Sequence, residues 1–175
     1  MSINAEKSLR IRTFCPNILS EAGHFVQVIT GEHPMSNTQL SFRPIIATPL
    51  PEKSRMGFLP AFFGENLMML GEPLVYHWMT TLSQDYNGGL WNYYTLSNGG
   101  FYMAPEQDKR YRVQVEGNYF DGELSADAAG IVATLFGLCE LANRTQADRI
   151  IDLYYLLRDY AGEHPEAGLI FAAID

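Results

Sequence analysis

Three carboxylates lie close together in the sequence, where they could act in acid/base catalysis. Asp121 and Glu123 are two residues apart on a predicted strand, so both project from one face, and Asp127 follows in the next predicted helix. A structural role explains the same residues: Glu123 can pair with Arg112 on the neighbouring strand, and Asp127 can complement the positive end of a helix. Nothing nearby raises a carboxyl pKa or supplies a nucleophile, so we expect no catalytic residue and no enzymatic activity.

Metal and cofactor sites are not expected either. The four histidines are scattered, and none has another histidine at the spacing of helical metal ligands. Cys15 and Cys139 lie far apart without ligand spacing, which predicts two reduced thiols. The sequence has no phosphate-binding glycine-rich loop ending in lysine, no G-x-S-x-G and no paired cysteine motif. We therefore expect no metal and no cofactor.

The stretch 84–105, QDYNGGLWNYYTLSNGGFYMAP, contains two Asn-Gly-Gly turns and a run of aromatic residues. It predicts a β-hairpin with a two-residue type I′ turn at Asn98-Gly99. In that register Leu96 faces Phe101 across the hairpin, and every other side chain is assigned to a face. One face, expected in the core, then holds Asn92, Tyr94, Leu96, Phe101 and Met103. The other holds Trp91, Tyr93, Thr95, Tyr102 and Ala104.

The second hairpin face carries aromatic residues with polar groups, which can either pack beneath a helix or form a recognition surface. From the hairpin geometry alone we name six candidate partner-binding residues: Asp85, Asn87, Trp91, Tyr93, Asn98 and Tyr102.

A second hairpin is predicted from residues 111–116, which alternate apolar and polar side chains. A two-residue turn at Gly117-Asn118 would place Val115 opposite Phe120 and Arg112 opposite Glu123. Apolar residues then meet on one face and opposite charges on the other, which supports this register.

The remaining segments are mostly helical in pattern. We expect helices at 73–86, at 126–142 with Ser125 as N-cap, and at 146–160 with a capping box of Thr145 and Asp148. Short helical turns are expected at 56–63 and 67–70, an extended lead-in at 45–51, and either a helical turn or a strand at 166–173. The order predicts an α+β fold: a small antiparallel meander of about four strands in two hairpins, packed against several helices in a single compact domain.

Residues 1–34 have isolated apolar groups and a Cys-Pro break, so we expect an N-terminal extension that is poorly packed or appended, and a folded domain at 35–175. Residues 51–175 hold 17 of the 20 acidic residues and 8 of the 12 basic ones. This acidic balance disfavours direct binding to nucleic acid, yet falls well short of the roughly twenty charges on ten base pairs of DNA. Without a signal peptide or a membrane-spanning apolar run, we expect a cytoplasmic protein that does not contact membranes.

Four segments together resemble the antirestriction proteins of the ArdB/KlcA family: residues 71–76 (GEPLVY), 85–89 (DYNGG), 91–105 (WNYYTLSNGGFYMAP) and 122–135 (GELSADAAGIVATL). The resemblance covers roughly residues 45–160. It implies a protein of mobile genetic elements, such as plasmids, that inhibits type I restriction-modification enzymes of the host and so protects incoming DNA. It also implies a compact fold without the extended acidic shape of DNA mimics, and it supplies no catalytic residues.

The partner implied by this resemblance is the type I restriction-modification complex, reached directly or through a host factor. Two other functions remain open at this point: an acidic DNA-mimic inhibitor, and a small enzyme that uses Asp121, Glu123 and Asp127. The sequence predicts neither the inhibitory surface nor the oligomeric state.

Overall fold

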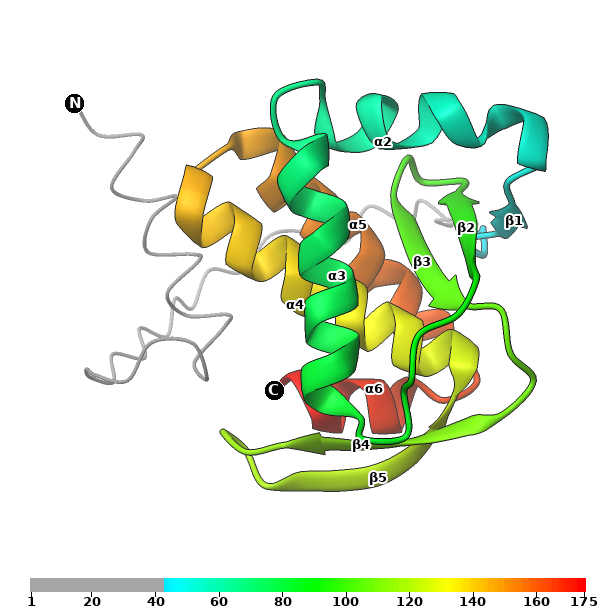
Figure 1. Ribbon diagram of the computed structural model, residues 1–175, viewed down its shortest axis with the longest axis vertical. Coiled ribbons are helices and arrows are strands. Elements are labelled where there is room, and N and C mark those ends of the chain that lie inside the picture. Colours follow the sequence, from blue (N-terminus) through cyan, green and yellow to red (C-terminus); the bar gives the residue numbers. More distant parts are fainter. Residues whose placement is uncertain (1–42) are drawn as a thin grey trace, which may run out of the picture.

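A central helix, α4 (Ala126–Thr145), organises the α+β fold in this computed structural model, which describes residues 43–175 (Figure 1). Ser125 is its N-cap, because the Ser125 side chain accepts a hydrogen bond from the Ala128 N–H, and Asp127 lies in the first turn. Both features were predicted from the sequence. Fourteen of the helix's 20 residues are buried, so α4 is surrounded by other elements on most sides.

The other helices are η1 (Glu52–Ser54), α2 (Arg55–Phe63), α3 (Met68–Leu82), α5 (Asp148–Glu163) and α6 (Ala167–Ile174). Helix α3 begins at Met68 and not at Pro73, because the Gly71 N–H already bonds to the Leu67 carbonyl, and it ends at Leu82 rather than near residue 86. The segment 166–173, for which helix and strand were both open, is helical.

The predicted capping box of α5 is wrong. Gln146 has a φ of 54° and ends α4 in the left-handed conformation, so α5 begins only at Asp148. The Thr145 hydroxyl donates to the Leu141 carbonyl of its own helix instead of capping the next one.

The first hairpin belongs to a three-stranded antiparallel sheet in the order β1 (Ala47–Pro49), β2 (Trp91–Leu96), β3 (Phe101–Pro105). The predicted type I′ turn is wrong. The Gly99 N–H bonds to the Leu96 carbonyl at 2.9 Å, and Gly99 has a φ of 92°, whereas Asn98 is outside the positive-φ region. The connection is therefore the three-residue type in which glycine supplies the left-handed position.

This longer turn shifts the register by one residue from the prediction. Tyr94 lies opposite Tyr102, and Tyr93 lies opposite Met103. Because side chains alternate along a strand, the shift moves the β3 side chains to the opposite face relative to β2. Tyr94 and Tyr102 stack with ring centroids 4.5 Å apart, so the predicted face that combined Tyr93 with Tyr102 does not exist.

The second hairpin, β4 (Arg110–Val115) and β5 (Phe120–Ser125), has the predicted register, with Val115 opposite Phe120. Its turn differs, because residues 116–119 form a four-residue loop with Tyr119 at a φ of 60°. The ion pair predicted between Arg112 and Glu123 is not formed. Arg112 donates to Asp121 through two nitrogens, at 2.7 and 2.6 Å, instead. β4 and β5 form a sheet of their own, so the expected single meander is divided into two sheets.

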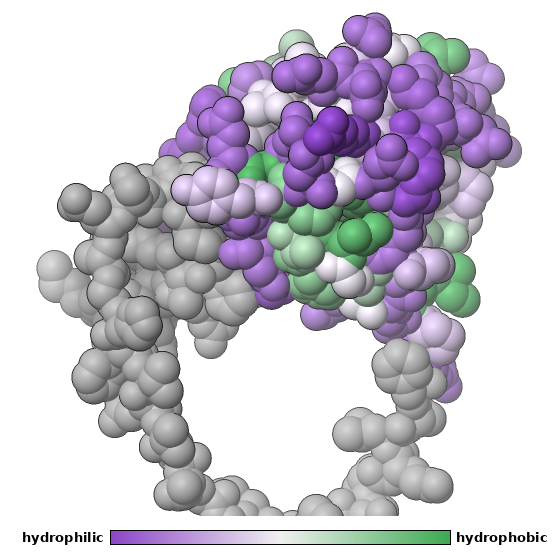
Figure 2. All heavy atoms as spheres, turned by 90° about the horizontal axis from the view of Figure 1, so that it is seen from below, coloured by the Kyte–Doolittle hydropathy of each residue, from purple (hydrophilic) through white to green (hydrophobic). Residues whose placement is uncertain are grey.

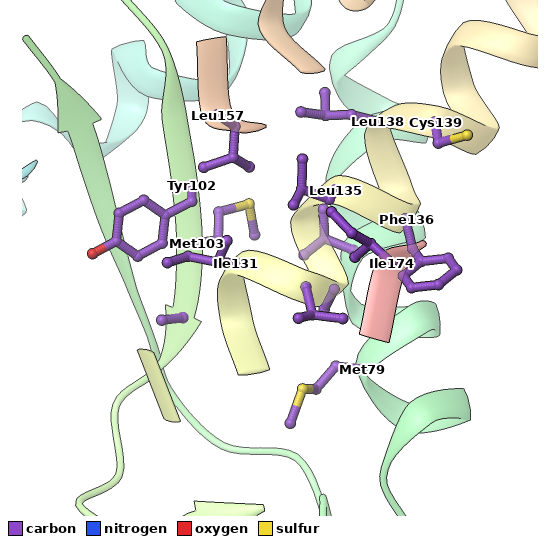
Figure 3. Close-up of a cluster of buried hydrophobic side chains, with 14 of the residues drawn as sticks. Met79, Tyr102, Met103, Ile131, Leu135, Phe136, Leu138, Cys139, Leu157 and Ile174 are labelled. Atoms are coloured by element: carbon purple, nitrogen blue, oxygen red, sulfur yellow. The ribbon is translucent and has the colours of Figure 1, made fainter. Parts of the chain in front are cut away.

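The core lies where α4 packs against β3 on one side and α3 on the other (Figure 3). Gly130 allows the close approach to β3, since a Cβ there would lie 2.5 Å from both the Ala104 Cα and the Met103 carbonyl oxygen. The Thr134 hydroxyl accepts a hydrogen bond from the Met103 N–H at 3.2 Å.

By length and composition α4 could cross a membrane, but 83% of its most apolar window is buried inside the domain, as in the core helix of a globular fold.

The end of the molecule that carries the β4–β5 hairpin and α6 has a mostly hydrophilic surface around one hydrophobic area (Figure 2).

Two sequence predictions fall on residues outside the described part: the N-terminal extension at 1–34 and the state of Cys15. Cys139, on α4, is disulfide-bonded, so the prediction of a reduced thiol is wrong for this residue.

Candidate functional site

A groove of about 690 Å³ opens between α3, the start of α2, β2 and the loop that precedes β2. We call it the aromatic groove, because four of its lining side chains are aromatic: Tyr76, Tyr86, Trp91 and Tyr93. Arg55, at the first position of α2, is the only charged residue among the described residues that line it. Thr80 and residues 87–90 complete its walls.

The tyrosines of the aromatic groove are held in place by a carboxylate. The hydroxyls of Tyr76 and Tyr93 both donate to Glu72 Oε1, at 2.7 and 2.8 Å, and lie 3.2 Å from each other. Burial raises the pKa of both phenols, and the hydrogen bonds to Glu72 raise it further. Both tyrosines are therefore neutral donors at physiological pH, and their rings are fixed in orientation.

The other wall is built around Trp91, which is 5% exposed. Its Nε1 donates to the Tyr86 hydroxyl at 2.8 Å, and its ring lies 4.9 Å from that of Tyr76. The adjoining loop turns at Gly88 and Gly89, with φ angles of 83° and 137°, which favour glycine. This turn leaves the next side chain, Leu90, 71% exposed at the rim.

Three of the six candidate partner-binding residues lie on the aromatic groove. Asn87 is exposed in the loop, Tyr93 is half-buried, and Trp91 contributes mainly as support. The two aromatic residues lie on the same face of β2, as the alternation predicts.

The other three candidates lie elsewhere, in contacts that hold the fold together. The Asp85 carboxylate accepts the Arg112 N–H at 3.1 Å. The Asn98 side chain donates to the Leu156 carbonyl at 2.8 Å and accepts the N–H of the residue after its turn. Tyr102 is 1% exposed and donates to Asp127 at 2.9 Å. The six residues therefore do not form one continuous surface.

The three carboxylates that could suggest catalysis are not brought together. Asp121 is paired with Arg112, whose hydrogen bonds hold the pKa of that carboxyl below its usual value. Asp127 contacts other side chains: it accepts a hydrogen bond from the Tyr102 hydroxyl, and His164 Nε2 lies 3.2 Å from its carboxylate. Within residues 43–175 no group of three His, Cys, Asp or Glu side chains is placed to hold a metal ion.

A second cavity, of about 600 Å³, lies beside the first turn of α4. Tyr94, one of its lining residues, belongs to a stack of three tyrosines, with Tyr102 between Tyr94 at 4.5 Å and Tyr160 at 5.6 Å. Sequence reasoning missed this stack, because Tyr160 comes from α5 and no local pattern connects it to the hairpin. The Glu72–Tyr76 pair, by contrast, has the four-residue helical spacing that could have indicated it.

Comparison with known proteins identifies the family. Residues 84–175 match the model of the antirestriction protein family. Two proteins of Escherichia coli, both called antirestriction protein KlcA, are 53% and 56% identical to this chain over 137 and 138 residues. These alignments cover 76% and 75% of this chain and 96% and 94% of the relatives.

A solved structure matches with a TM-score of 0.72 and 52% identity, over 79% of this chain and all of the other. That structure belongs to the KlcA and ArdB proteins, which show a novel fold and antirestriction activity against type I DNA restriction systems in vivo but not in vitro. The match confirms the predicted α+β fold and the resemblance of the sequence. The chain belongs to the antirestriction protein family.

Proposed function

We propose that this protein protects incoming, unmodified DNA of mobile elements by inhibiting the type I restriction-modification enzymes of its host, without catalysis and without imitating DNA. The observation that carries the proposal is the match to KlcA along most of both chains, with the same fold. The protein acts in the cytoplasm, where restriction takes place, and needs no cofactor.

The distribution of carboxylates supports an inhibitor that is not a DNA mimic. A mimic presents a continuous row of free negative charges at about the spacing of DNA phosphates. Here at least five carboxylates are paired with arginines of this chain: Asp121, Glu123, Glu140, Glu166 and Asp175. Glu72 accepts hydrogen bonds from two tyrosines instead of facing solvent as a free charge.

The related KlcA and ArdB proteins have antirestriction activity in vivo but not in vitro, which favours a route through a further component of the cell. In this proposal the protein reaches the type I complex together with a host factor. Inhibition of the purified enzyme then requires that factor to be added.

The function is tested by the plating efficiency of phage on cells that carry a type I system. Expression of this protein should raise the plating of unmodified phage toward that of modified phage, while modified phage plates equally well with or without it. Equal restriction of unmodified phage in expressing and control cells would refute the proposal.

Two further measurements separate the mechanisms. The double variant Asp121→Asn with Glu123→Gln should protect as well as the wild type, and loss of protection with an intact fold would favour the enzymatic alternative. Pull-down from cells with a type I system should recover the complex with little dependence on salt. Capture that falls steeply between low and high salt would favour DNA mimicry.

A further inference from the structure

The aromatic groove offers a ligand mainly aromatic and apolar surface, since three of its four aromatic side chains already donate their hydrogen bonds within the protein. The hydroxyls of Tyr76 and Tyr93 are occupied by Glu72, and Trp91 Nε1 by Tyr86. These three donors are therefore not available to a ligand, and among the four aromatic side chains only the Tyr86 hydroxyl, which accepts from Trp91, keeps a proton to donate. A ligand would find a rigid apolar and aromatic wall, with exposed Leu90 extending it at the rim.

Arg55 supplies the single charge of this wall, and that charge is not compensated. Among the described residues it has no ion pair, and its Nε is buried without a hydrogen-bond partner. Its guanidinium carbon lies over the Tyr93 ring, 5.7 Å from the ring centroid, so the cation is held beside the aromatic side chains of the groove. Glu72 is the nearest acid to the tyrosines, and it is occupied by their hydroxyls.

Together these features fit a ligand that carries an anionic group next to a flat or apolar group. Arginine binds carboxylates with two parallel hydrogen bonds, and tyrosine, tryptophan and arginine are the residues most enriched at the energetic centres of protein interfaces. The volume of about 690 Å³ is that of a pocket for one or two side chains.

We infer that the aromatic groove binds an acidic peptide segment of a protein partner, with a carboxylate on Arg55 and an aromatic side chain against Tyr76 and Tyr93. Charge complementarity selects this occupant over nucleic acid. The groove offers one uncompensated cation in a chain with a net charge of -8, while polynucleotide binding relies on several cations that neutralise successive phosphates. This inference rests on the proposed function, in which the partner is a component of the restricting cell, and it specifies the surface that the partner contacts.

The test is an NMR titration of the isotope-labelled full chain with a blocked tripeptide, acetyl-Glu-Phe-Glu-amide. Binding should shift the amide signals of Asn87 and Leu90. Two analogues, acetyl-Gln-Phe-Gln-amide and acetyl-Glu-Ala-Glu-amide, should each bind about fivefold more weakly, the change expected for one partly solvated ion pair or one stacked ring.

Variants of the protein locate the binding site. Arg55→Gln should lose the same factor of about five for the glutamate peptide and nothing for the glutamine analogue. Lys53→Gln is the matched control, because it removes an exposed cation two residues away that does not line the groove. Circular dichroism and an unchanged melting temperature show that each variant is folded.

Three results would overturn the inference: no shift of the groove signals at any peptide concentration, equal affinity of the wild type and Arg55→Gln, or tighter binding of thymidine 5′-monophosphate than of the peptide. The last result would assign the groove to nucleotides. The titration contains no restriction enzyme, so its failure is separate from a failure of protection in cells. Loss of protection by folded Arg55→Gln, with Lys53→Gln protecting fully, would connect the groove to the function.

Discussion

The contact between α4 and β3 predicts that Gly130→Ala destabilises the domain, although alanine is the better helix former. A Cβ at residue 130 would lie 2.5 Å from the Ala104 Cα and from the Met103 carbonyl oxygen, about 1 Å inside ordinary van der Waals contact. Both atoms belong to the backbone, so α4 must move away from the sheet. Overpacking of this kind costs about 3 kcal/mol, and the higher helix propensity of alanine returns about 1 kcal/mol. The free energy of unfolding should therefore fall by about 2 kcal/mol.

For a domain of this size, that loss corresponds to a melting temperature lower by roughly 6–8 °C. Far-UV circular dichroism during heating, with urea denaturation at 25 °C, measures both quantities. The matched control is Gly162→Ala in α5, where the nearest atom beyond the helix is Phe171 Cε2 at 3.8 Å. This variant should gain up to about 1 kcal/mol. If Gly130→Ala raises the melting temperature as Gly162→Ala does, α4 and β3 are not in close contact, and the argument from the core is refuted.

Two other perturbations follow from the described contacts, and a third follows from the sequence. Tyr102→Phe removes a buried hydroxyl that donates to Asp127, so the free energy of unfolding should fall by about 1–2 kcal/mol in urea denaturation. Burial raises the pKa of Glu166, but hydrogen bonds from the Ser125 N–H and from Arg110 outweigh it and leave the pKa below its usual value. This carboxylate therefore contributes stability that is complete above the unfolded-state pKa of about 4.5 and is lost as the pH falls through the folded-state pKa. The stability difference between the wild type and Glu166→Gln, measured by denaturation from pH 7 downward, should shrink below about pH 4.5. Deletion of residues 1–34 should leave a cooperative thermal transition, as expected if the folded domain lies within 35–175.

Each of these predictions has an outcome that contradicts it. An unchanged stability of Tyr102→Phe, together with an unchanged Tyr119→Phe control at a 93% exposed position, would mean that the Asp127 contact is not formed. A stability difference for Glu166→Gln that grows on acidification would reverse the assigned direction of the pKa shift. A broad, non-cooperative transition after the deletion would show that residues 1–34 are part of the folded unit.

The sequence predicted best where a local pattern and a long-range constraint agree. The alternation at residues 111–116 has only one register that keeps apolar residues on one face, and the structure has that register. Helix α4 was predicted because two signals agree. Ser125 and Asp127 mark its N-terminus, and the almost wholly apolar sequence that follows is typical of a buried helix. Neither feature depends on details of the turn that precedes it.

The first hairpin was predicted in the wrong register because Asn-Gly fits two turns of different length. In a two-residue turn both residues take positive φ angles, while in the three-residue turn observed here only Gly99 does. Aromatic and apolar residues of β2 and β3 occur on both faces of the hairpin, so the hydrophobic pattern does not distinguish between the two registers. The aromatic groove was found only in part for a related reason: Arg55 and Glu72 come from helices, and their distance from the hairpin is set by tertiary packing.

The covered edge of β3 limits how this protein can meet a partner. The N–H of Met103 points away from β2 and is taken up by Thr134 of α4, which lies against that edge. The opposite edge, β1, is three residues long and ends at Pro49, which has no N–H to donate. Extension of this sheet by a strand from another chain is therefore blocked on one side and poorly supported on the other. Recognition at this sheet falls to side chains, and selectivity for a partner can change by substitutions at the surface while the hydrogen-bonded framework stays the same.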